Sequence, residues 1–233
     1  MGKNLIQQRR GKGTTRFRAR SFASAGDAAL KGKQSYTVLD LINSAGHSAP
    51  LARVQYEDNT NGLIIAAEGL FVGKQYAIGE EAPVDYGNAL ALKDIPEGTP
   101  VFNIENRPGD GGKFIKSSGA AGRLVNRTEK GVTVKLPSKR NKTFHPECKA
   151  IIGFVAGGGR TEKPFLKAGT KHHAMKARNK YYPIVSGSAM NAVAHPFGNK
   201  RSLRKSKAKP TSRHAPPGRK VGAIAAKRTG RKR

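Results

Sequence analysis

The positive charge of this chain is confined to its two ends. Of the formal net charge of +29, residues 1–34 carry +8, residues 35–155 carry +1 and residues 156–233 carry +20. No acidic residue follows Glu162. A protein that needs charge only for solubility can spread it over its whole surface, whereas a neutral centre between basic, nearly acid-free flanks is typical of a polyanion binder. The sequence therefore predicts nucleic acid as the partner.

The neutral centre, about 120 residues long, is the part of the chain that can bury a core. From residue 36 onward, short apolar runs alternate with turns rich in Gly, Pro, Asn and Asp, which predicts many short antiparallel strands. The expected strands are 36–42, 52–57, 63–67, 75–78, 89–92, 101–104, 113–115, 122–126, 132–136, 142–145 and 150–155.

These strands are too many for one five-stranded barrel, and the turn at 95–100 is the best junction between two. We therefore expect a mainly β fold with two small antiparallel barrels. The first is OB-fold-like and spans residues 35–94, and the second is SH3-like and spans residues 95–160.

Both flanks are too polar and too rich in glycine to bury a core of their own. We expect long irregular extensions: a basic N-terminal arm over residues 1–34 and a basic C-terminal extension over residues 161–233. A short helix is expected at 161–168, with Thr161 as its N-cap and Gly169 as its stop. The rest of both arms is expected to take its structure from a partner.

A glycine-rich cluster in the centre could approach a phosphate backbone closely. It runs from Arg107 to Lys113, and Lys116 and Ser117 follow shortly after it. The cluster lacks the spacing of a Walker loop, which disfavours nucleotide hydrolysis. An ordinary inter-strand loop is the alternative interpretation.

The sequence gives little evidence for a catalytic site or a metal site. His145 and Cys148, with the adjacent His172 and His173 further on, lack the paired spacing of a zinc site, and Cys148 lies in a strand-rich segment where a lone cysteine is usually a core residue. We predict no catalytic residue, no metal site and no enzyme. A single cysteine also excludes an internal disulfide, and no apolar run spans a bilayer, so we expect an intracellular protein.

Residues 187–198 form an uncharged stretch of twelve residues inside the basic C-terminal arm, which indicates a shaped contact. Here the chain resembles the L-two family of large-subunit ribosomal proteins, in its archaeal and eukaryotic branch. The resemblance rests on AMNAVAHPFG at 189–198, SRHAPPGRKVG at 212–222, AKRTGR at 226–231, and RPGDGGK at 107–113 followed by SSG at 117–119.

The resemblance implies a two-barrel body whose extensions penetrate ribosomal RNA (rRNA) near the peptidyl transferase region. The implied function is structural: to bind large-subunit rRNA, support assembly of that region, subunit association and tRNA binding. Implied partners are neighbouring ribosomal proteins, the small subunit and, indirectly, tRNA, in the cytoplasmic ribosome. No membrane, small-molecule substrate or cofactor is implied; Mg²⁺ and K⁺ serve only as counterions shared with rRNA.

By the same resemblance, His195 is the residue closest to the peptidyl transferase centre, with a contact role rather than general-base chemistry. The chain departs from the family in two places. Ala194 stands where the family has Asp, and Gly198-Asn199-Lys200 stands where the family has a glycine run.

The residues expected to contact rRNA are mostly cations of the flanks and of the glycine-rich cluster. They are Arg9, Arg10, Lys12, Arg16, Arg18, Arg20, Arg107, Lys113, Lys116, Ser117, Lys167, Lys171, His172, Lys176, Arg178, Met190, Asn191, His195, Pro196, Lys200, Arg201, Arg213, His214, Arg219, Lys220, Lys227 and Arg228.

Two other functions stay open from the residues alone. A general nucleic-acid-compacting or chaperone protein needs only charge and arms, and it leaves the neutral stretch unexplained. An RNA-processing or transferase enzyme would have to use His195 or Cys148.

Overall fold

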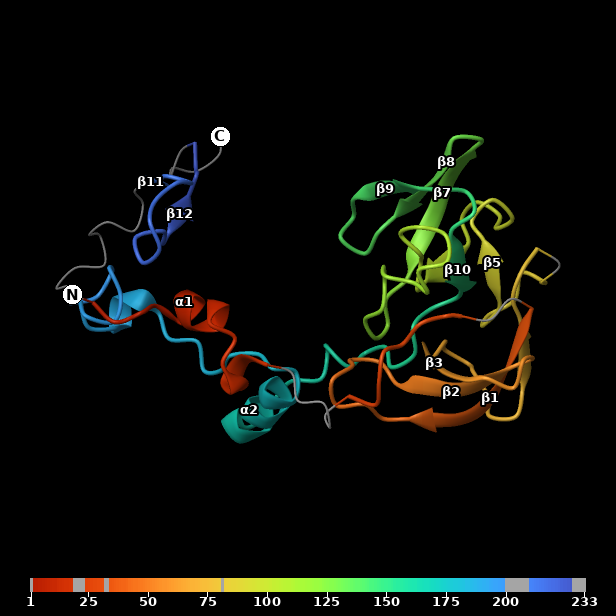
Figure 1. The fold of residues 1–233 in the computed structure, drawn as a ribbon, viewed down its shortest axis with the longest axis horizontal. Helices are drawn as coiled ribbons and strands as arrows, with labels where there is room; N and C mark the ends of the chain where they lie inside the picture. The colour runs from red at the N-terminus through yellow and green to blue at the C-terminus, as the bar shows by residue number, and fades with distance from the viewer. Residues whose placement is uncertain (1, 19–23, 32–33, 81, 200–209, 228–233) are drawn as a thin grey trace. The chain divides into compact units, whose positions relative to one another are not determined.

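The computed structural model describes residues 2–18, 24–31, 34–80, 82–199 and 210–227 (Figure 1). The chain divides into two compact units. Residues 20–166 form one, here called the β unit, and residues 1–19 together with 167–233 form the other, here called the basic unit. The two ends of the sequence thus belong to a single unit.

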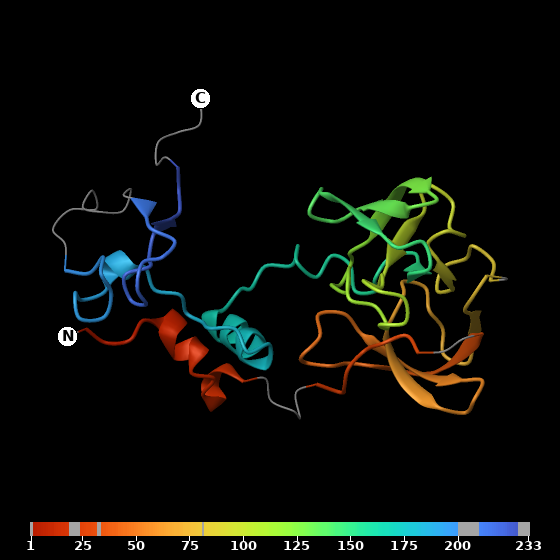
Figure 2. The ribbon, with the colours of Figure 1, turned by 45° about the horizontal axis from the view of Figure 1, so that its top comes forward.

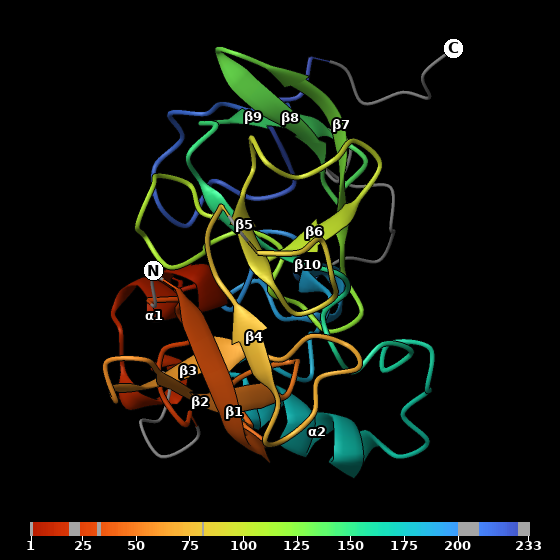
Figure 3. The ribbon, with the colours of Figure 1, turned by 90° about the vertical axis from the view of Figure 1, so that its right-hand side faces the viewer.

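The first sheet of the β unit contains β1 (Ser35–Ile42), β2 (Leu51–Tyr56), β3 (Asn61–Ile65) and β4 (Gln75–Ala77). Its order is β3-β2-β1-β4 and every pair is antiparallel; Figure 3 shows β4 beside β1. Side chains alternate across β2, where Val54 and Tyr56 are buried and Arg53 is exposed. This period of two is the pattern of a strand with one face on the core.

The second sheet contains β5 (Ala89–Ala91), β6 (Pro100–Phe102), β7 (Gly122–Thr128), β8 (Gly131–Lys135), β9 (Asn141–Phe144) and β10 (Lys149–Ile152). Its order is β5-β10-β6-β7-β8-β9, again antiparallel throughout. The strand pairing does not follow the boundary between barrels that we expected after residue 94. Strand β5 lies before that boundary, and yet it pairs with β10 in the second sheet.

Three strands of the second sheet separate two hydrophobic cores. On β5, Ala89 packs into the first core and Leu90 into the second. The same alternation places Phe102 and Ile151 in the first core and Ile152 in the second. Strands that are buried on both faces have continuous runs of apolar residues in their sequence. The predicted mainly β class, with two small antiparallel parts, is confirmed.

The N-terminal boundary of the β unit also differs from the expected arm over residues 1–34. Ala28 and Leu30 are each 5% exposed and belong to the first core. The amide of Ala29 donates to the carbonyl of Leu63 and the amide of Leu30 to that of Gly111. Two apolar side chains, two positions apart in the sequence, thus attach this segment to the β unit, within a stretch whose composition predicted an arm.

Ten of the expected strands are present, with bounds shifted by up to three residues. The eleventh, at 113–115, is wrong: Phe114 makes one isolated bridge to Ile104, and Ile115 adopts a φ of 57° that interrupts a strand.

The helix expected at 161–168 is also wrong, because residues 161–163 form a turn and a bend, residues 164–166 have no regular secondary structure, and α2 spans Ala168–Ala177. The residues after Gly169 are mostly good helix formers, and one glycine costs only about 1 kcal/mol.

The basic unit carries short elements joined by irregular chain. They are α1 (Ile6–Gly11), η1 (Thr15–Phe17), α2, η3 (Gly187–Ala189), β11 (Pro210–Thr211) and β12 (Ala223–Ile224), the last two paired in parallel. Within the part of the chain that the structure describes, no helix has the length and apolarity needed to cross a bilayer.

Candidate nucleic-acid interface

The basic unit contains no acidic residue in its sequence. Six Lys and Arg come from residues 1–19 and nineteen from residues 167–233, with no Asp or Glu among them. No cation of this unit can therefore form an ion pair with an acidic side chain of the same unit. Neutralisation must come largely from outside, and an array of phosphates is the matching counter-charge.

The N-terminal segment and the C-terminal extension are held together by specific contacts (Figure 2). The amide of Lys3 donates to the carbonyl of Val193 at 2.7 Å. The side-chain amide of Asn179 donates to the carbonyl of Phe17. The two expected arms are thus parts of one structure rather than separate tails.

An arginine–tyrosine cluster adds to this contact. The guanidinium groups of Arg10 and Arg16 lie 5.9 and 5.1 Å from the ring centroid of Tyr181. Both arginines are exposed and were expected to contact RNA, whereas Tyr181 was not anticipated. The aromatic pair Tyr181-Tyr182, unusual in so basic a stretch, was the available signal. Cation–π contact orients the arginines without neutralising them.

Helix α2 carries a second group of the predicted residues. Lys171 lies 5.3 Å from the ring centroid of Tyr182, and the rings of His172 and His173 meet edge to face at 5.4 Å. Lys167 precedes the helix, and Lys176 and Arg178 are at its end. Cations at a helix C-terminus complement the helix dipole, so Lys176 and Arg178 stabilise the helix as well as adding charge.

The uncharged stretch forms a compact loop around His195. The carbonyl of Asn191 accepts hydrogen bonds from the amides of Ala194 and His195, and the amide of Asn199 donates to the carbonyl of Met190 at 3.1 Å. Gly198 is buried so closely against the main chain of Asn191 that a Cβ there would overlap it. Asn199 adopts a φ of 52°, a conformation that asparagine tolerates, so this residue is accommodated where the resemblance led us to expect glycine.

The His195 ring is oriented without the carboxylate that the resemblance led us to expect at position 194. Its Nδ1 accepts a hydrogen bond from the amide of Phe197 at 3.0 Å, and the two rings meet edge to face at 5.1 Å. An Nδ1 that accepts from an amide leaves the hydrogen of the neutral ring on Nε2. The backbone therefore selects the tautomer.

A second basic loop is closed by β11 and β12. The hydroxyl of Thr211 donates to the carbonyl of Val221 at 2.9 Å, and the amide of Ala225 donates to the carbonyl of Thr211 at 2.8 Å. Val221 is buried beneath the loop. The cations and the histidine between these anchors, Arg213, His214, Arg219 and Lys220, are all exposed, and all of them are predicted contacts.

The glycine-rich cluster of the β unit is a rigid loop shaped by two carboxylates. Glu105 is 2% exposed, and its oxygens accept the amides of Gly109, Gly111 and Lys149 at 2.9–3.1 Å. Asp110 accepts the amides of Asn106, Arg107 and Gly112, and these bonds lower the pKa of Asp110 against the opposing effect of burial. Neither acid was anticipated as a loop organiser.

This loop leaves Arg107 and Lys113 exposed, as a contact with phosphates requires, and Ser117 is exposed as well. Lys116 differs. Its Nζ donates to the carbonyl of Ala28 at 2.7 Å and to that of Gly112 at 3.3 Å, and burial lowers its pKa. Lys116 thus ties the 24–31 segment to the loop, a role that sequence patterns do not distinguish from phosphate binding.

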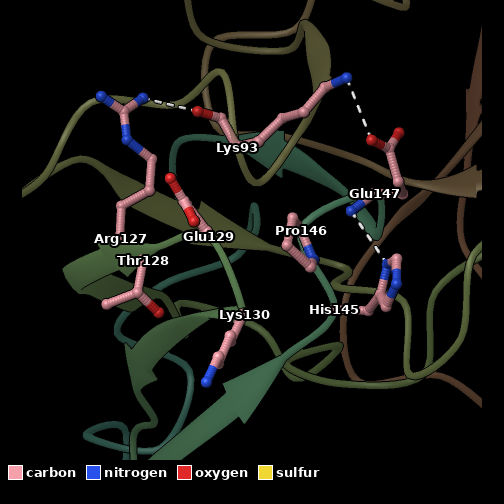
Figure 4. Close-up of a pocket in the computed structure, with 8 residues that line it drawn as sticks. All are labelled: Lys93, Arg127, Thr128, Glu129, Lys130, His145, Pro146 and Glu147. Atoms are coloured by element: carbon pink, nitrogen blue, oxygen red, sulfur yellow. Dashed lines mark hydrogen bonds and ion pairs between the residues drawn. The ribbon is translucent and has the colours of Figure 1, made fainter.

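A pocket of about 630 Å³ lies between the β7–β8 turn and the β9–β10 connection (Figure 4). Lys93 Nζ lies 2.6 Å from Glu80 and 3.1 Å from Glu147, and these hydrogen-bonded carboxylates raise the pKa of Lys93. Arg127 donates to the carbonyl of Lys93. Because Lys93 is already paired, this pocket is a weaker candidate for phosphate than the acid-free unit.

The described residues form no site for a metal ion or for thiol chemistry. These residues include no group of three or more His, Cys, Asp or Glu close enough to hold a metal ion. Cys148 is fully buried in the second core, where burial raises the pKa of its thiol, so the expectation of a core cysteine is confirmed.

The structure brings most of the predicted contacts into the basic unit or the glycine loop. Besides the residues located above, Arg9, Lys12, Arg18, Pro196 and Lys227 are exposed, and Met190 is half-buried. Arg20, Lys200, Arg201 and Arg228 lie outside the described residues.

Comparison with known proteins identifies the family. Residues 85–216 match the family described as Ribosomal Proteins L2, C-terminal domain. Relatives named large ribosomal subunit protein uL2 are 47% identical in Methanothermobacter thermautotrophicus, with both chains fully covered, and 49% identical in Archaeoglobus fulgidus, again with both fully covered. The relative of that name in Haloarcula marismortui is 49% identical, covering 99% of this chain and 98% of its own. The chain therefore belongs to the ribosomal protein L2 family, in its archaeal type, and is a structural protein of the large ribosomal subunit rather than an enzyme.

Proposed function

We propose that the chain binds large-subunit rRNA, with the basic unit between RNA helices and the glycine loop on the RNA backbone. The observation that carries this proposal is the charge division: twenty-five cations and no acid in one unit, beside a β unit that is nearly neutral between residues 35 and 155. A globular domain anchors the protein, and the acid-free unit supplies fixed counterions.

The physical benefit is to the RNA. Phosphate backbones that approach one another repel, and each Lys or Arg inserted between them releases condensed counterions. Mg²⁺ and K⁺ share this screening without a dedicated site on the chain. In this role the protein supports assembly of the peptidyl transferase region, subunit association and, indirectly, tRNA binding, beside neighbouring ribosomal proteins in cytoplasmic ribosomes. His195 contacts RNA there and transfers no proton.

The test is the salt dependence of binding between the full-length protein and a large-subunit rRNA transcript. If about 6–11 phosphates are neutralised, the log–log slope of affinity against salt has a magnitude of about 5–10. Replacing Arg213, Arg219 and Lys220 with Gln should reduce the slope by about 3, because each phosphate contact contributes close to one. The matched control replaces Lys130, Lys139 and Arg140, exposed turn cations of the β unit, and should leave the slope unchanged.

A general nucleic-acid-compacting protein is the second candidate, favoured by the same charge. It would bind duplex DNA and rRNA of equal length with equal affinity and would protect no defined nucleotides. Equal binding of both would reject the rRNA-specific function. A slope near zero would reject the electrostatic account as a whole.

A further inference from the structure

A cavity of about 450 Å³ lies entirely within the basic unit, in front of the His195 ring. Its walls come from three parts of the sequence: Gln7 of α1, Ser186 and Ser188 at the η3 turn with His195 beyond it, and the 220–224 segment. Its volume is in the range of pockets that hold drug-sized ligands, roughly 300–1,000 Å³. No segment alone would form it.

The lining has the chemistry of a nucleotide site. Lys220 and two serines, Ser186 and Ser188, are among the lining residues, and no acidic side chain exists in this unit to repel an anion. Apolar surface comes from Phe197, Val221 and Ile224. A phosphate suits the cation, a ribose suits the hydroxyls, and an unstacked base suits an aromatic wall, which is how single-stranded RNA is commonly recognised.

The position of the His195 ring is tightly constrained at this cavity. The amide of Phe197 holds Nδ1 and leaves the hydrogen of the neutral ring on Nε2. The ring also packs directly against Gly187, so closely that a Cβ at position 187 would overlap three of the ring atoms. Gly187 is therefore a positioning residue for His195, and even a methyl group there must displace the ring.

We propose that this cavity receives one unstacked nucleotide of the rRNA, with Lys220 on its phosphate and His195 and the serines on its ribose or base edge. The inference rests on the proposed rRNA binding and deepens it. It gives the uncharged stretch within a basic extension a purpose that charge neutralisation alone does not: to shape a pocket for one base.

The test compares two glycine substitutions in the full-length protein. Gly187→Ala moves the His195 ring, whereas Gly169→Ala, in α2, meets no atom within 4 Å and is the matched control. The readout is nucleotide-resolution chemical footprinting of a large-subunit rRNA transcript, with the overall Kd measured in parallel. Gly187→Ala should abolish protection at one or two nucleotides and weaken the Kd by about 5- to 150-fold, the equivalent of the 1–3 kcal/mol that one nucleotide contact is worth, while the other contacts remain. Gly169→Ala should match the wild-type footprint.

Lys220→Gln provides a second variant on an exposed side chain that cannot disturb a core. It should weaken protection at the same nucleotides as Gly187→Ala and lower the salt slope by about one. If both variants keep the wild-type footprint, or if they affect different nucleotides, the pocket assignment is overturned. If Gly187→Ala misfolds, Lys220→Gln alone decides. Wild-type protein that protects no specific nucleotides would instead reject the proposed function itself.

Discussion

The carboxylate of Glu105 accepts a hydrogen bond from the amide of Lys149 at 2.9 Å, across 44 residues of sequence. The same carboxylate accepts the amides of Gly109 and Gly111. One buried acid thus fixes the glycine loop to the first residue of β10. Because burial of an unpaired carboxylate is costly, all three amide donors matter to the stability of the β unit.

Replacing Glu105 with Ala should lower the free energy of unfolding by about 3 kcal/mol, because it leaves three amides without their charged acceptor. Urea denaturation of the full chain measures the loss. The control is Glu129→Ala, an exposed acid at the β7–β8 turn, which should stay within about 0.5 kcal/mol of wild type. Equal stability of the two variants would contradict the anchoring role.

The two loop glycines Gly109 and Gly112 should respond differently to Ala. Both have a positive φ, 83° and 94°, but an added Cβ meets nothing within 4 Å at Gly109 and overlaps Asn103 at Gly112. Gly109→Ala should cost only the backbone strain, about 1–2 kcal/mol, and Gly112→Ala clearly more. Thermal unfolding compares them, and a larger loss at Gly109 would be inconsistent with the observed packing.

His47 should make the β unit less stable in mild acid. Burial lowers the pKa of His47 from its ordinary value of 6.5, the charge of Lys116 lowers it further, and Asp27 opposes the shift. A lowered histidine pKa means that the unfolded state binds the proton more readily, so its contribution to stability is present above pH 6.5 and is lost as the pH falls below that value.

Replacing His47 with Gln should therefore flatten the pH dependence of unfolding between about pH 7 and 5, by at most about 1.4 kcal/mol per pH unit. Urea titrations at several pH values measure it. His173→Gln, at an exposed histidine of α2, is the control and should leave the wild-type slope. An unchanged slope in the His47 variant would show that this ring is not the titrating group.

Tyr181 should govern how firmly the N-terminal segment is held in the free protein. Its ring contacts two arginines, at about 0.5–1 kcal/mol each for exposed cation–π pairs, so Tyr181→Ala should raise trypsin cleavage after Arg16 by roughly 5- to 30-fold. Tyr181→Phe keeps a ring and should stay near wild type. Equal cleavage of the Ala and Phe variants would rule out the ring contact as the cause.

Much of the β unit followed from local pattern. Short apolar runs bounded by turn residues predicted ten of its strands because a strand's side-chain period is local. The sequence pattern places the run at Ala89–Ala91 in the first barrel and the run at Lys149–Ile152 in the second. The two strands pair with each other instead, and both of their faces are buried because they line two cores at once. The segment around Ala28 and Leu30 is predicted to belong to the N-terminal arm, because two apolar residues are too few to indicate a buried segment.

The candidate nucleic-acid interface likewise has parts that the sequence predicted and parts that it did not. Charge and motif located the basic loops around Arg213 and His195, because electrostatics and loop composition are properties of the chain itself. The cavity beside His195 could not be predicted, since Gln7, Ser188 and Lys220 come from three distant segments. Lys116 is a residue that the sequence predicted as a phosphate ligand, but in the structure its Nζ donates to two backbone carbonyls.

The amino-acid sequence by itself determined that this protein is basic at its ends and neutral at its centre, that the centre is built of short strands, and which family it belongs to. Tertiary structure alone decided that the two ends form one unit, that a buried glutamate shapes the glycine loop, and that a backbone amide orients His195. The reason is physical: charge and side-chain period are fixed by local order, whereas burial and hydrogen-bond partners depend on which distant segments meet.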